Sequence, residues 1–363
     1  MNICLISDRF ATEHGGGGTT YANSLAKLLS EKHNLTVSTI DFNNLGNEYK
    51  KNLEINRIKL ENSPWTSNGF MEFCRKSSEF VSANSFDIVH AVNPSVAMSL
   101  KKNSFITTAH GSSLSEISAL MKEGSLNFKN LKQSMNSYFA EMFSIHKSLQ
   151  TISTSNACRK EIAKHYFYPK TEMIYYCVDS SFVPSKKFSD FILFSGRLSE
   201  RKGIMTLLKA IKGLEIELHI VGEGDLRKKI EQFVKENNLE KRVKLFGWLN
   251  GKNLLQEFQN CKFLVTPSNY EIFGIVNIEA MACGKSVIAS NVSGIPEIVK
   301  HNENGLLCRN GNVQEFQNAI KKLYYDDALR EKLEKSALKT AEKFNENIFL
   351  QKHLKLYEKV ISK

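Results

Sequence analysis

The chain has 363 residues, of which 42% are hydrophobic and 24% charged, which is ordinary for a globular protein with room for two domains. It contains no run of 18 apolar residues and no secretory leader pattern, so we expect a cytoplasmic protein without a membrane span. The formal net charge of +11 does not by itself indicate nucleic acid, because basic proteins also bind nucleotide phosphates and anionic lipid surfaces, and we find no nucleic-acid-binding motif.

The seven cysteines are odd in number and widely scattered, without the close spacing of zinc sites or disulfide frameworks. We therefore expect reduced, mostly buried thiols and no metal site.

An apolar run over residues 1–7, predicted to be a strand, is followed by four glycines at positions 15–18 and an amphipathic helix predicted over residues 19–30. A strand, a glycine loop and a helix could hold a phosphate, because glycines let backbone amides approach a ligand and the helix N-terminus attracts anions. The spacing matches neither the dinucleotide-binding nor the Walker fingerprint, so a merely flexible loop is the alternative.

Residues 35–40 and 87–91 are further β-rich runs, separated by a polar region that we interpret as irregular. A third run ends in His110-Gly111, which would put the imidazole at the carboxyl edge of a sheet, where ligands of open α/β domains bind. A neutral imidazole there could donate to a sugar hydroxyl. The alternative is a histidine at a strand end that is hydrogen-bonded to the backbone.

Residues 112–149 carry Leu, Met and Phe at roughly helical spacing, including Ile117, Met121 and Phe139, with interspersed lysines. We expect a helix pair that packs this stripe into the domain core. A helix lying on a membrane surface is the alternative.

Strands are predicted again at residues 149–155 and 170–176 and then, after a polar linker over residues 180–190, at 191–195, 217–221, 243–246, 263–266 and 286–289, alternating with helices. Within the last of these units, Glu271 and Glu279 flank Phe273-Gly274-Ile275, where a loop becomes a helix. The free amides of the first turn and both carboxylates could converge on one ligand. Alternatively, Glu271 complements the helix dipole and Glu279 is solvated.

Several motifs of the second half occur together in one known family. They are Glu271 and Glu279 separated by seven residues, Ala280-Met281-Ala282, Gly284, Gly294-Ile295-Pro296-Glu297, Gly196-Arg197-Leu198 and Arg201-Lys202-Gly203. In these the chain resembles the retaining glycosyltransferases of family 4, which have the GT-B fold. The resemblance is densest over residues 191–307 and thin over residues 45–85 and 112–149. The chain also departs from the family at Tyr176-Cys177, where Asn-Gly is common.

The resemblance implies an α/β fold of GT-B type, with two doubly wound Rossmann-like domains facing each other across a cleft. We expect the first, acceptor-side domain at residues 1–180 and the second, donor-side domain at residues 181–344. In this fold the last helix, about residues 345–363, commonly packs back on the first domain.

The resemblance further implies transfer of a hexose-type sugar, with retention, from a nucleoside-diphosphate sugar to a hydroxyl acceptor. The residues predicted to be catalytic are His110, Arg197, Lys202 and Glu271. The residues predicted to bind the donor are Gly17, Gly18, Phe273, Gly274, Ile275 and Glu279. The chain has no Asp-x-Asp motif, and the cations of Arg197 and Lys202 can stabilise a leaving diphosphate in place of Mg²⁺, so we expect no metal cofactor.

Two alternatives remain open at this point. One is a sugar-nucleotide epimerase of GT-B type, and the other is a catalytically silent subunit that binds a nucleotide sugar or a lipid surface. The base, the sugar, the acceptor and the linkage are not encoded in any pattern that we can derive, and peripheral contact with a membrane surface stays possible.

Overall fold

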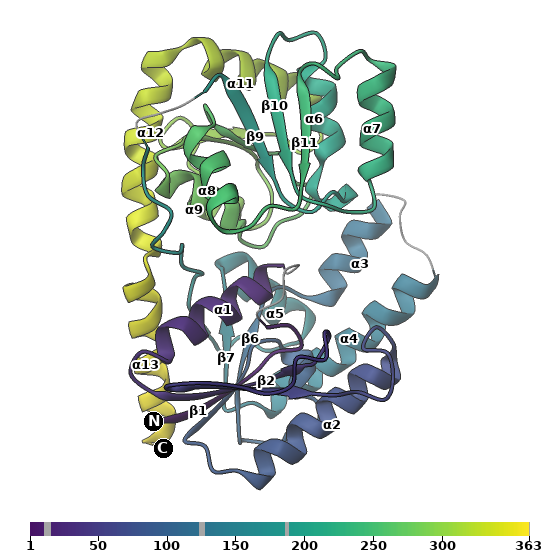
Figure 1. Ribbon diagram of the computed structural model, residues 1–363, viewed down its shortest axis with the longest axis vertical. Helices are drawn as coiled ribbons and strands as arrows, with labels where there is room; N and C mark the ends of the chain where they lie inside the picture. Colours follow the sequence, from purple (N-terminus) through teal and green to yellow (C-terminus); the bar gives the residue numbers. More distant parts are fainter. Residues whose placement is uncertain (11–15, 123–127, 186–188, 363) are drawn as a thin grey trace. The chain divides into compact units, whose positions relative to one another are not determined.

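The computed structural model describes residues 1–10, 16–122, 128–185 and 189–362. The chain divides into two compact units, which we call unit 1, Met1–Cys177 with Glu346–Lys363, and unit 2, Val178–Asn345. Each unit is a sheet with helices packed beside it (Figure 1). The boundaries between the units lie within a few residues of positions 180 and 344.

The sheet of unit 1 has the strand order β3-β4-β2-β1-β5-β6-β7-β8, and its neighbouring strands are parallel except β3 and β4. Its central strands are buried along almost their whole length, as expected for a sheet covered on both faces. The elements are β1 Asn2–Ile6, α1 Gly17–Leu29, β2 Asn34–Ile40, β3 Glu48–Lys50, β4 Leu53–Ile58, α2 Ser67–Ala83, β5 Ile88–Ala91, the 3₁₀ helix η1 Pro94–Ala97, β6 Ile106–Ala109, α3 Ser113–Lys122, α4 Phe128–Lys147, β7 Gln150–Ser153, α5 Asn156–His165, β8 Thr171–Met173 and α13 Glu346–Ile361.

The sheet of unit 2 is wholly parallel, in the order β11-β10-β9-β12-β13-β14. Helices contribute amphipathic faces to its core; α11, for example, buries Phe316, Ile320 and Leu323 at helical spacing. The elements are β9 Phe191–Ser195, η2 Glu200–Lys202, α6 Ile204–Ile211, β10 Glu217–Val221, α7 Arg227–Glu236, β11 Val243–Gly247, α8 Gly251–Asn260, β12 Leu264–Thr266, α9 Ile275–Ala282, β13 Val287–Ser290, α10 Ile295–Ile298, β14 Gly305–Cys308, α11 Val313–Tyr325, α12 Asp327–Ala341 and η3 Glu342–Phe344.

The predicted parallel α/β architecture is confirmed, but the interpretation of the region between residues 40 and 87 as irregular is wrong. This region contains β3, β4 and the helix α2. Thr66 caps α2 by accepting a hydrogen bond from the amide of Gly69 at 3.1 Å, so this glycine lies in the first turn of a helix. β4 is only partly buried along its length, and for that reason its sequence lacks a clear strand pattern.

The helix pair predicted over residues 112–149 is present as α3 and α4, but its apolar stripe is not wholly buried. Ile117 and Ile145 belong to the core, whereas Met121, Phe139 and Phe143 are each more than half exposed. The prediction that the whole stripe packs into the core is therefore wrong for Met121 and Phe139. All seven cysteines are free and buried, as expected.

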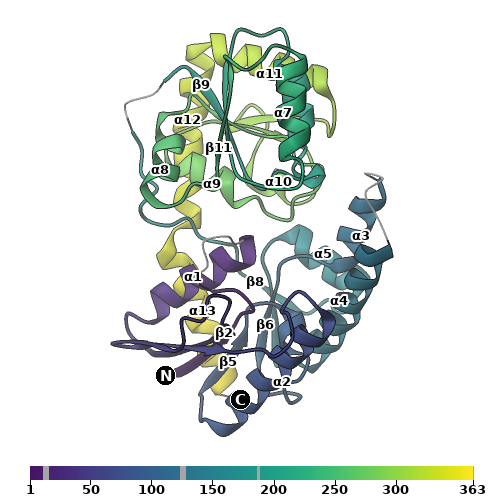
Figure 2. The same ribbon diagram turned by 45° about the vertical axis from the view of Figure 1, so that its right-hand side comes forward.

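Within unit 1, a buried network of hydrogen bonds joins α13 to the N-terminal segment, and α1 and α13 lie side by side (Figures 1 and 2). His353 Nδ1 lies 2.8 Å from the carbonyl oxygen of Phe349, which can only accept, so Nε2 of the neutral ring accepts from the Tyr21 hydroxyl at 2.5 Å. Nearby, His90 lies 2.7 Å from both the Tyr357 hydroxyl and the Thr108 hydroxyl. Burial lowers the pKa of both histidines, that of His353 to about 4, which keeps the rings neutral.

In each sheet the strand order reverses at one point. In unit 1 the chain moves outward from β1 through β2 on one side and from β5 through β8 on the other. In unit 2 the same reversal lies between β9 and β12. Ligands of open α/β sheets bind beyond the carboxyl ends of the strands at such a switch point. The loops after β1, β5, β9 and β12 are therefore where a site is expected.

Candidate active site

At the switch point of unit 2, Lys202 and Glu271 form an ion pair, although they are far apart in the sequence. Both side chains are largely buried, with 16% and 14% of their surface exposed. Burial acts to raise the pKa of Glu271, but the charges of Lys202 and then Arg201 outweigh it and hold this pKa below its usual value. The carboxylate is therefore ionised and is held by a cation at the carboxyl edge of the sheet.

The loops that carry this pair are joined through their backbones. The amide of Asn269 donates to the carbonyl oxygen of Arg201 at 2.8 Å, and its side-chain amide donates to the carbonyl oxygen of Glu200 at 2.8 Å. Gly203 has a φ of +66°, and a Cβ there would collide with the carbonyl of Pro267. The position of Lys202 relative to the loop after β12 is thus set by close backbone contact. Sequence reasoning missed Asn269, whose only signal is its place just after a strand and a proline.

The loop after Glu271 leads into α9. Phe273 is buried and packs edge-on against Phe344, with ring centroids 5.6 Å apart. Gly274 has a φ of +86°, and Ile275 is the first residue of the helix. The N-cap residue Gly274 has no side chain to cap this helix, and the first turn has no acidic residue, so an anion could accept from the free amides.

Asn277, in the first turn of α9, was also missed. It is fully buried, and its Oδ1 accepts from the Thr266 hydroxyl at 2.9 Å, which fastens the helix to the end of β12. A Cβ on Gly274 would come 2.6 Å from Nδ2 of Asn277 and 3.3 Å from Cγ of Glu271. Gly274 is thus needed both for its backbone conformation and for space beside the predicted acid.

Glu279 lies about one helical turn after Ile275, the first residue of α9, and is half-buried. Its carboxylate has no hydrogen-bond partner among residues 1–10, 16–122, 128–185 and 189–362. Burial, followed by the negative charge of Asp179, raises its pKa to about 7. A raised pKa and a carboxylate without a hydrogen-bond partner are features of a group that can bind a hydrogen-bond donor of a ligand.

Arg197 follows β9 and Gly196 and is exposed, with no ion-pair partner in the described part of the chain. It lies in the same β9–α6 connection as Lys202. The structure therefore brings Lys202 together with Glu271 and places Arg197 in the same connection as Lys202. It carries Phe273, Gly274, Ile275 and Glu279 at the start of one helix.

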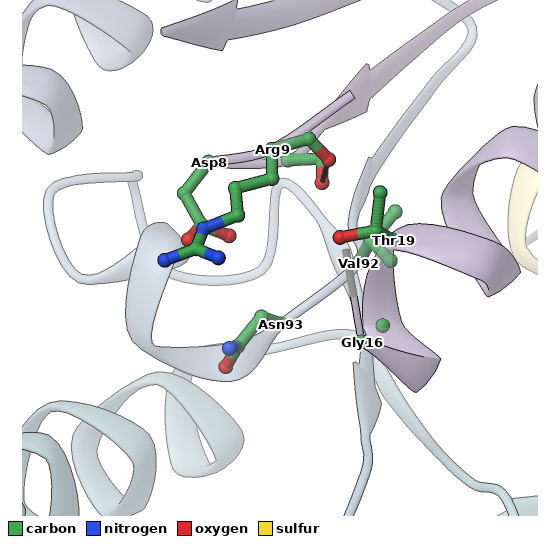
Figure 3. Close-up of a pocket in the computed structure, with 8 residues that line it drawn as sticks. Asp8, Arg9, Gly16, Thr19, Val92 and Asn93 are labelled. Carbon is green, nitrogen blue, oxygen red and sulfur yellow. Dashed lines mark hydrogen bonds between the residues drawn. The ribbon is translucent and has the colours of Figure 1, made fainter. Parts of the chain in front are cut away.

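In unit 1 a hollow opens at the switch point between β1 and β5 (Figure 3). It is lined by Ser7, Asp8, Arg9, Gly16, Gly18, Thr19, Val92 and Asn93. Burial raises the pKa of Asp8, and the charge of Arg9 opposes this only in part. Arg9 also stacks on the ring of Trp65, with its guanidinium carbon 4.6 Å from the ring centroid. Sequence reasoning missed Asp8 and Asn93, which follow two neighbouring strands.

The predicted glycine loop is shorter than expected, because α1 begins at Gly17. Gly17 and Gly18 therefore lie in the first turn of the helix and not in a loop before it, a correction to the predicted boundary at residue 19. Gly18 lines the hollow, whereas Gly17 is exposed. Glycine has no strong helix signal, so the sequence pattern placed the start too late.

His110 follows β6 directly, at the carboxyl edge of the sheet, as predicted. Its Nε2 lies 2.7 Å from the carbonyl oxygen of Val92 and its Nδ1 lies 2.6 Å from the Tyr176 hydroxyl. Burial lowers the pKa of His110 to about 4, and the bond to Val92 opposes this only in part. Both ring nitrogens are hydrogen-bonded within unit 1, and the bond from Nε2 to Val92 agrees with the alternative of a histidine bonded to the backbone.

Among the residues that the structure describes, no helix combines the length and apolar character needed to cross a bilayer. In the same residues, no three His, Cys, Asp or Glu side chains are grouped as metal ligands.

Comparison with known proteins defines the class to which this arrangement belongs. The chain superposes on sucrose-phosphate synthase from Thermosynechococcus elongatus with a TM-score of 0.84, at 24% identity, covering 99% of both chains. It superposes on HepE from Anabaena, solved in complex with UDP and glucose, with a TM-score of 0.78, at 19% identity and 99% coverage of both chains. The fold is that of the GT-B glycosyltransferases.

Sequence comparison then identifies the family. The model "Glycosyltransferase Family 4" matches residues 15–182, and the model "Glycosyl transferases group 1" matches residues 180–340. An uncharacterized glycosyltransferase from Methanocaldococcus jannaschii is 28% identical over 358 residues, covering 95% of each chain. The chain belongs to family 4 of the glycosyltransferases and is a glycosyltransferase.

Proposed function

We propose that the protein transfers a hexose-type sugar, with retention of configuration and without a metal ion, from a nucleoside-diphosphate sugar to a hydroxyl acceptor. The observation that carries the proposal is the ion pair of Lys202 with Glu271 at the switch point of unit 2, next to Arg197 and the uncapped N-terminus of α9. A diphosphate needs cations and free amides, and a sugar needs hydrogen-bond acceptors beside them. HepE, which has the same fold, was solved with UDP-glucose, in line with a nucleotide-sugar donor.

In the proposed reaction the bond between the anomeric carbon and the diphosphate oxygen breaks, and the acceptor oxygen attacks from the same face. The acceptor proton passes to the leaving phosphate oxygen, so no enzymic nucleophile is required. Lys202 and Arg197 would stabilise the negative charge that develops on the diphosphate, the part that a divalent metal plays elsewhere. Glu271 would accept from hydroxyls of the transferred sugar.

Two further residues have roles that rest on the resemblance to the family. Glu279 would accept from the ribose hydroxyls, in line with its unused carboxylate and its raised pKa. His110 would contact the transferred sugar through its Nε2–H, sharing that hydrogen with the Val92 carbonyl to which it is bonded. The hollow between β1 and β5, with Asp8 and Asn93 on its walls, is where we expect the acceptor hydroxyl.

The test is a thermal-shift panel of UDP-, GDP- and ADP-sugars, because a ligand that binds only the folded state raises its melting temperature by mass action. We expect one nucleotide series to stabilise the wild type and the control Lys209→Ala, whose exposed lysine lies on α6, but to stabilise Lys202→Ala much less. Release of nucleoside diphosphate from the best donor should then continue in EDTA. Loss of that release, restored by Mg²⁺, would refute metal independence.

Retention is tested separately, by the anomeric configuration of the product formed from an α-configured donor. An α-linked product is expected, and a β-linked one would refute the proposed stereochemistry. Conversion of the donor to an isomer in the absence of acceptor would favour an epimerase instead.

A further inference from the structure

Tyr176 stands where the sequence departs from the family pattern, and it contacts a predicted site residue. It is buried, it follows β8 near the end of the first segment of unit 1, and its hydroxyl lies 2.6 Å from His110 Nδ1. Tyr176 and His110 are far apart in the sequence, so no local motif predicts this contact.

The hydrogen-bond partners of His110 define where its proton lies. The carbonyl oxygen of Val92 can only accept, so Nε2 carries the hydrogen. Burial keeps the ring neutral at physiological pH, and a neutral imidazole has one hydrogen. Nδ1 is therefore an acceptor, and the Tyr176 hydroxyl must donate to it.

The two edges of the ring face different surroundings. A Cβ on Gly18 would lie 3.7 Å from Cδ2 and 3.8 Å from Nε2 of His110, so the Nε2 edge faces Gly18 and Val92, both of which line the hollow of unit 1. The Nδ1 edge faces Tyr176. Tyr21 packs edge-on against both rings, with centroids 5.2 Å from His110 and 5.6 Å from Tyr176, and so restricts their rotation.

We propose that Tyr176 is a positioning residue that holds His110 with its hydrogen at the edge facing the hollow. The donated hydrogen bond withdraws electron density from the ring and strengthens Nε2–H as a donor, so that it can share its hydrogen between the Val92 carbonyl and a sugar hydroxyl in a three-centre bond as the reaction proceeds. Tyr176 itself touches no substrate in this scheme. The inference rests on the role proposed for His110 and adds the residue through which that role is set.

The experiment compares Tyr176→Phe with the matched control Tyr175→Phe, which removes a hydroxyl from the adjacent residue. The Tyr175 hydroxyl accepts from Asn156 at 3.2 Å. Turnover is measured as nucleoside diphosphate released from saturating UDP-, GDP- or ADP-glucose, and affinity for the free nucleotide by calorimetry. We expect Tyr176→Phe to lower kcat about tenfold, the scale of one lost hydrogen bond, with nucleotide affinity unchanged. Tyr175→Phe should match the wild type.

A double-mutant cycle separates positioning from a merely structural role. If Tyr176 acts through His110, Tyr176→Phe should cost nothing further in a His110→Ala background, whereas a structural effect would persist. The ¹⁵N resonance of His110 Nδ1, assigned by its absence in His110→Ala, should shift in Tyr176→Phe to that of a nitrogen without a hydrogen-bond donor. It should stay unchanged in Tyr175→Phe.

The outcomes distinguish this inference from the proposed function. Wild-type turnover in Tyr176→Phe together with loss in His110→Ala, or an effect of Tyr176→Phe that persists in the His110→Ala background, would overturn the inference alone. Full turnover in His110→Ala would overturn the role proposed for His110 and, with it, that of Tyr176. Lower nucleotide affinity in Tyr176→Phe would also contradict positioning.

Discussion

The ribose-binding role proposed for Glu279, together with its pKa, predicts that nucleotide binding depends on pH. With a pKa of about 7, the ionised fraction of this carboxyl falls from about nine-tenths at pH 8 to about one-tenth at pH 6. Only the carboxylate accepts from both ribose hydroxyls, so bound nucleotide favours the ionised form and lowers this pKa in the complex. Affinity is therefore full above pH 7 and is lost as the pH falls through 7. The expected loss between pH 8 and pH 6 is about tenfold in Kd, or about 1.4 kcal/mol.

The assay is calorimetric titration of the wild type, Glu279→Gln and the control Glu331→Gln, which changes an exposed acid on α12, with UDP, GDP or ADP at pH 6 and pH 8. The terminal phosphate of the nucleotide titrates in the same range, but this contribution is common to all three proteins and cancels in the comparison. The ratio of the Kd at pH 6 to the Kd at pH 8 should be about tenfold smaller in Glu279→Gln than in the wild type. In Glu331→Gln this ratio should equal that of the wild type. An identical pH dependence in Glu279→Gln would refute the assignment of this carboxylate to the nucleotide.

Three further predictions concern the same elements. Lys202→Ala should lower kcat by about 10²-fold, the scale of one preorganised charge stabiliser, and near-native turnover at saturating donor would contradict its role. Gly294→Ala should lower the free energy of unfolding in urea by about 1 to 3 kcal/mol, because its Cβ would collide with the carbonyl of Ile272 in the loop after Glu271. An unchanged free energy of unfolding would show that this loop can shift without cost. Burial lowers the pKa of His353 from 6.5 to about 4, so its contribution to stability is present above pH 6.5 and is lost as the pH falls towards 4. At pH 5 this loss of stability is about 2 kcal/mol. Hydrogen exchange of α13 amides should show the loss in the wild type but not in His353→Gln. An equal loss in that variant would exclude His353 as its source.

The sequence alone determined the class of fold and much of unit 2. The β-rich residues 191–195 and 217–221 predicted β9 and β10 with the bounds that the structure has, because a largely buried parallel strand leaves a local signature. The spacing of Glu271 and Glu279 around a glycine predicted a ligand site at the start of a helix, since helix termini are also encoded locally. Where burial is partial, as in β4, the same reasoning failed.

The tertiary structure decided how distant residues are paired. Lys202 and Glu271 were predicted separately, as a phosphate cation and a sugar ligand, and only the adjacency of β9 and β12 in the sheet makes them one ion pair. The partners of His110 come from loops far along the chain, so no spacing could reveal that Tyr176 donates to its ring. The pKa values of Glu271 and Glu279 likewise diverge because one carboxylate is buried beside cations and the other beside Asp179. Burial and neighbouring charge are properties of the folded chain, and they determine what each acid can do.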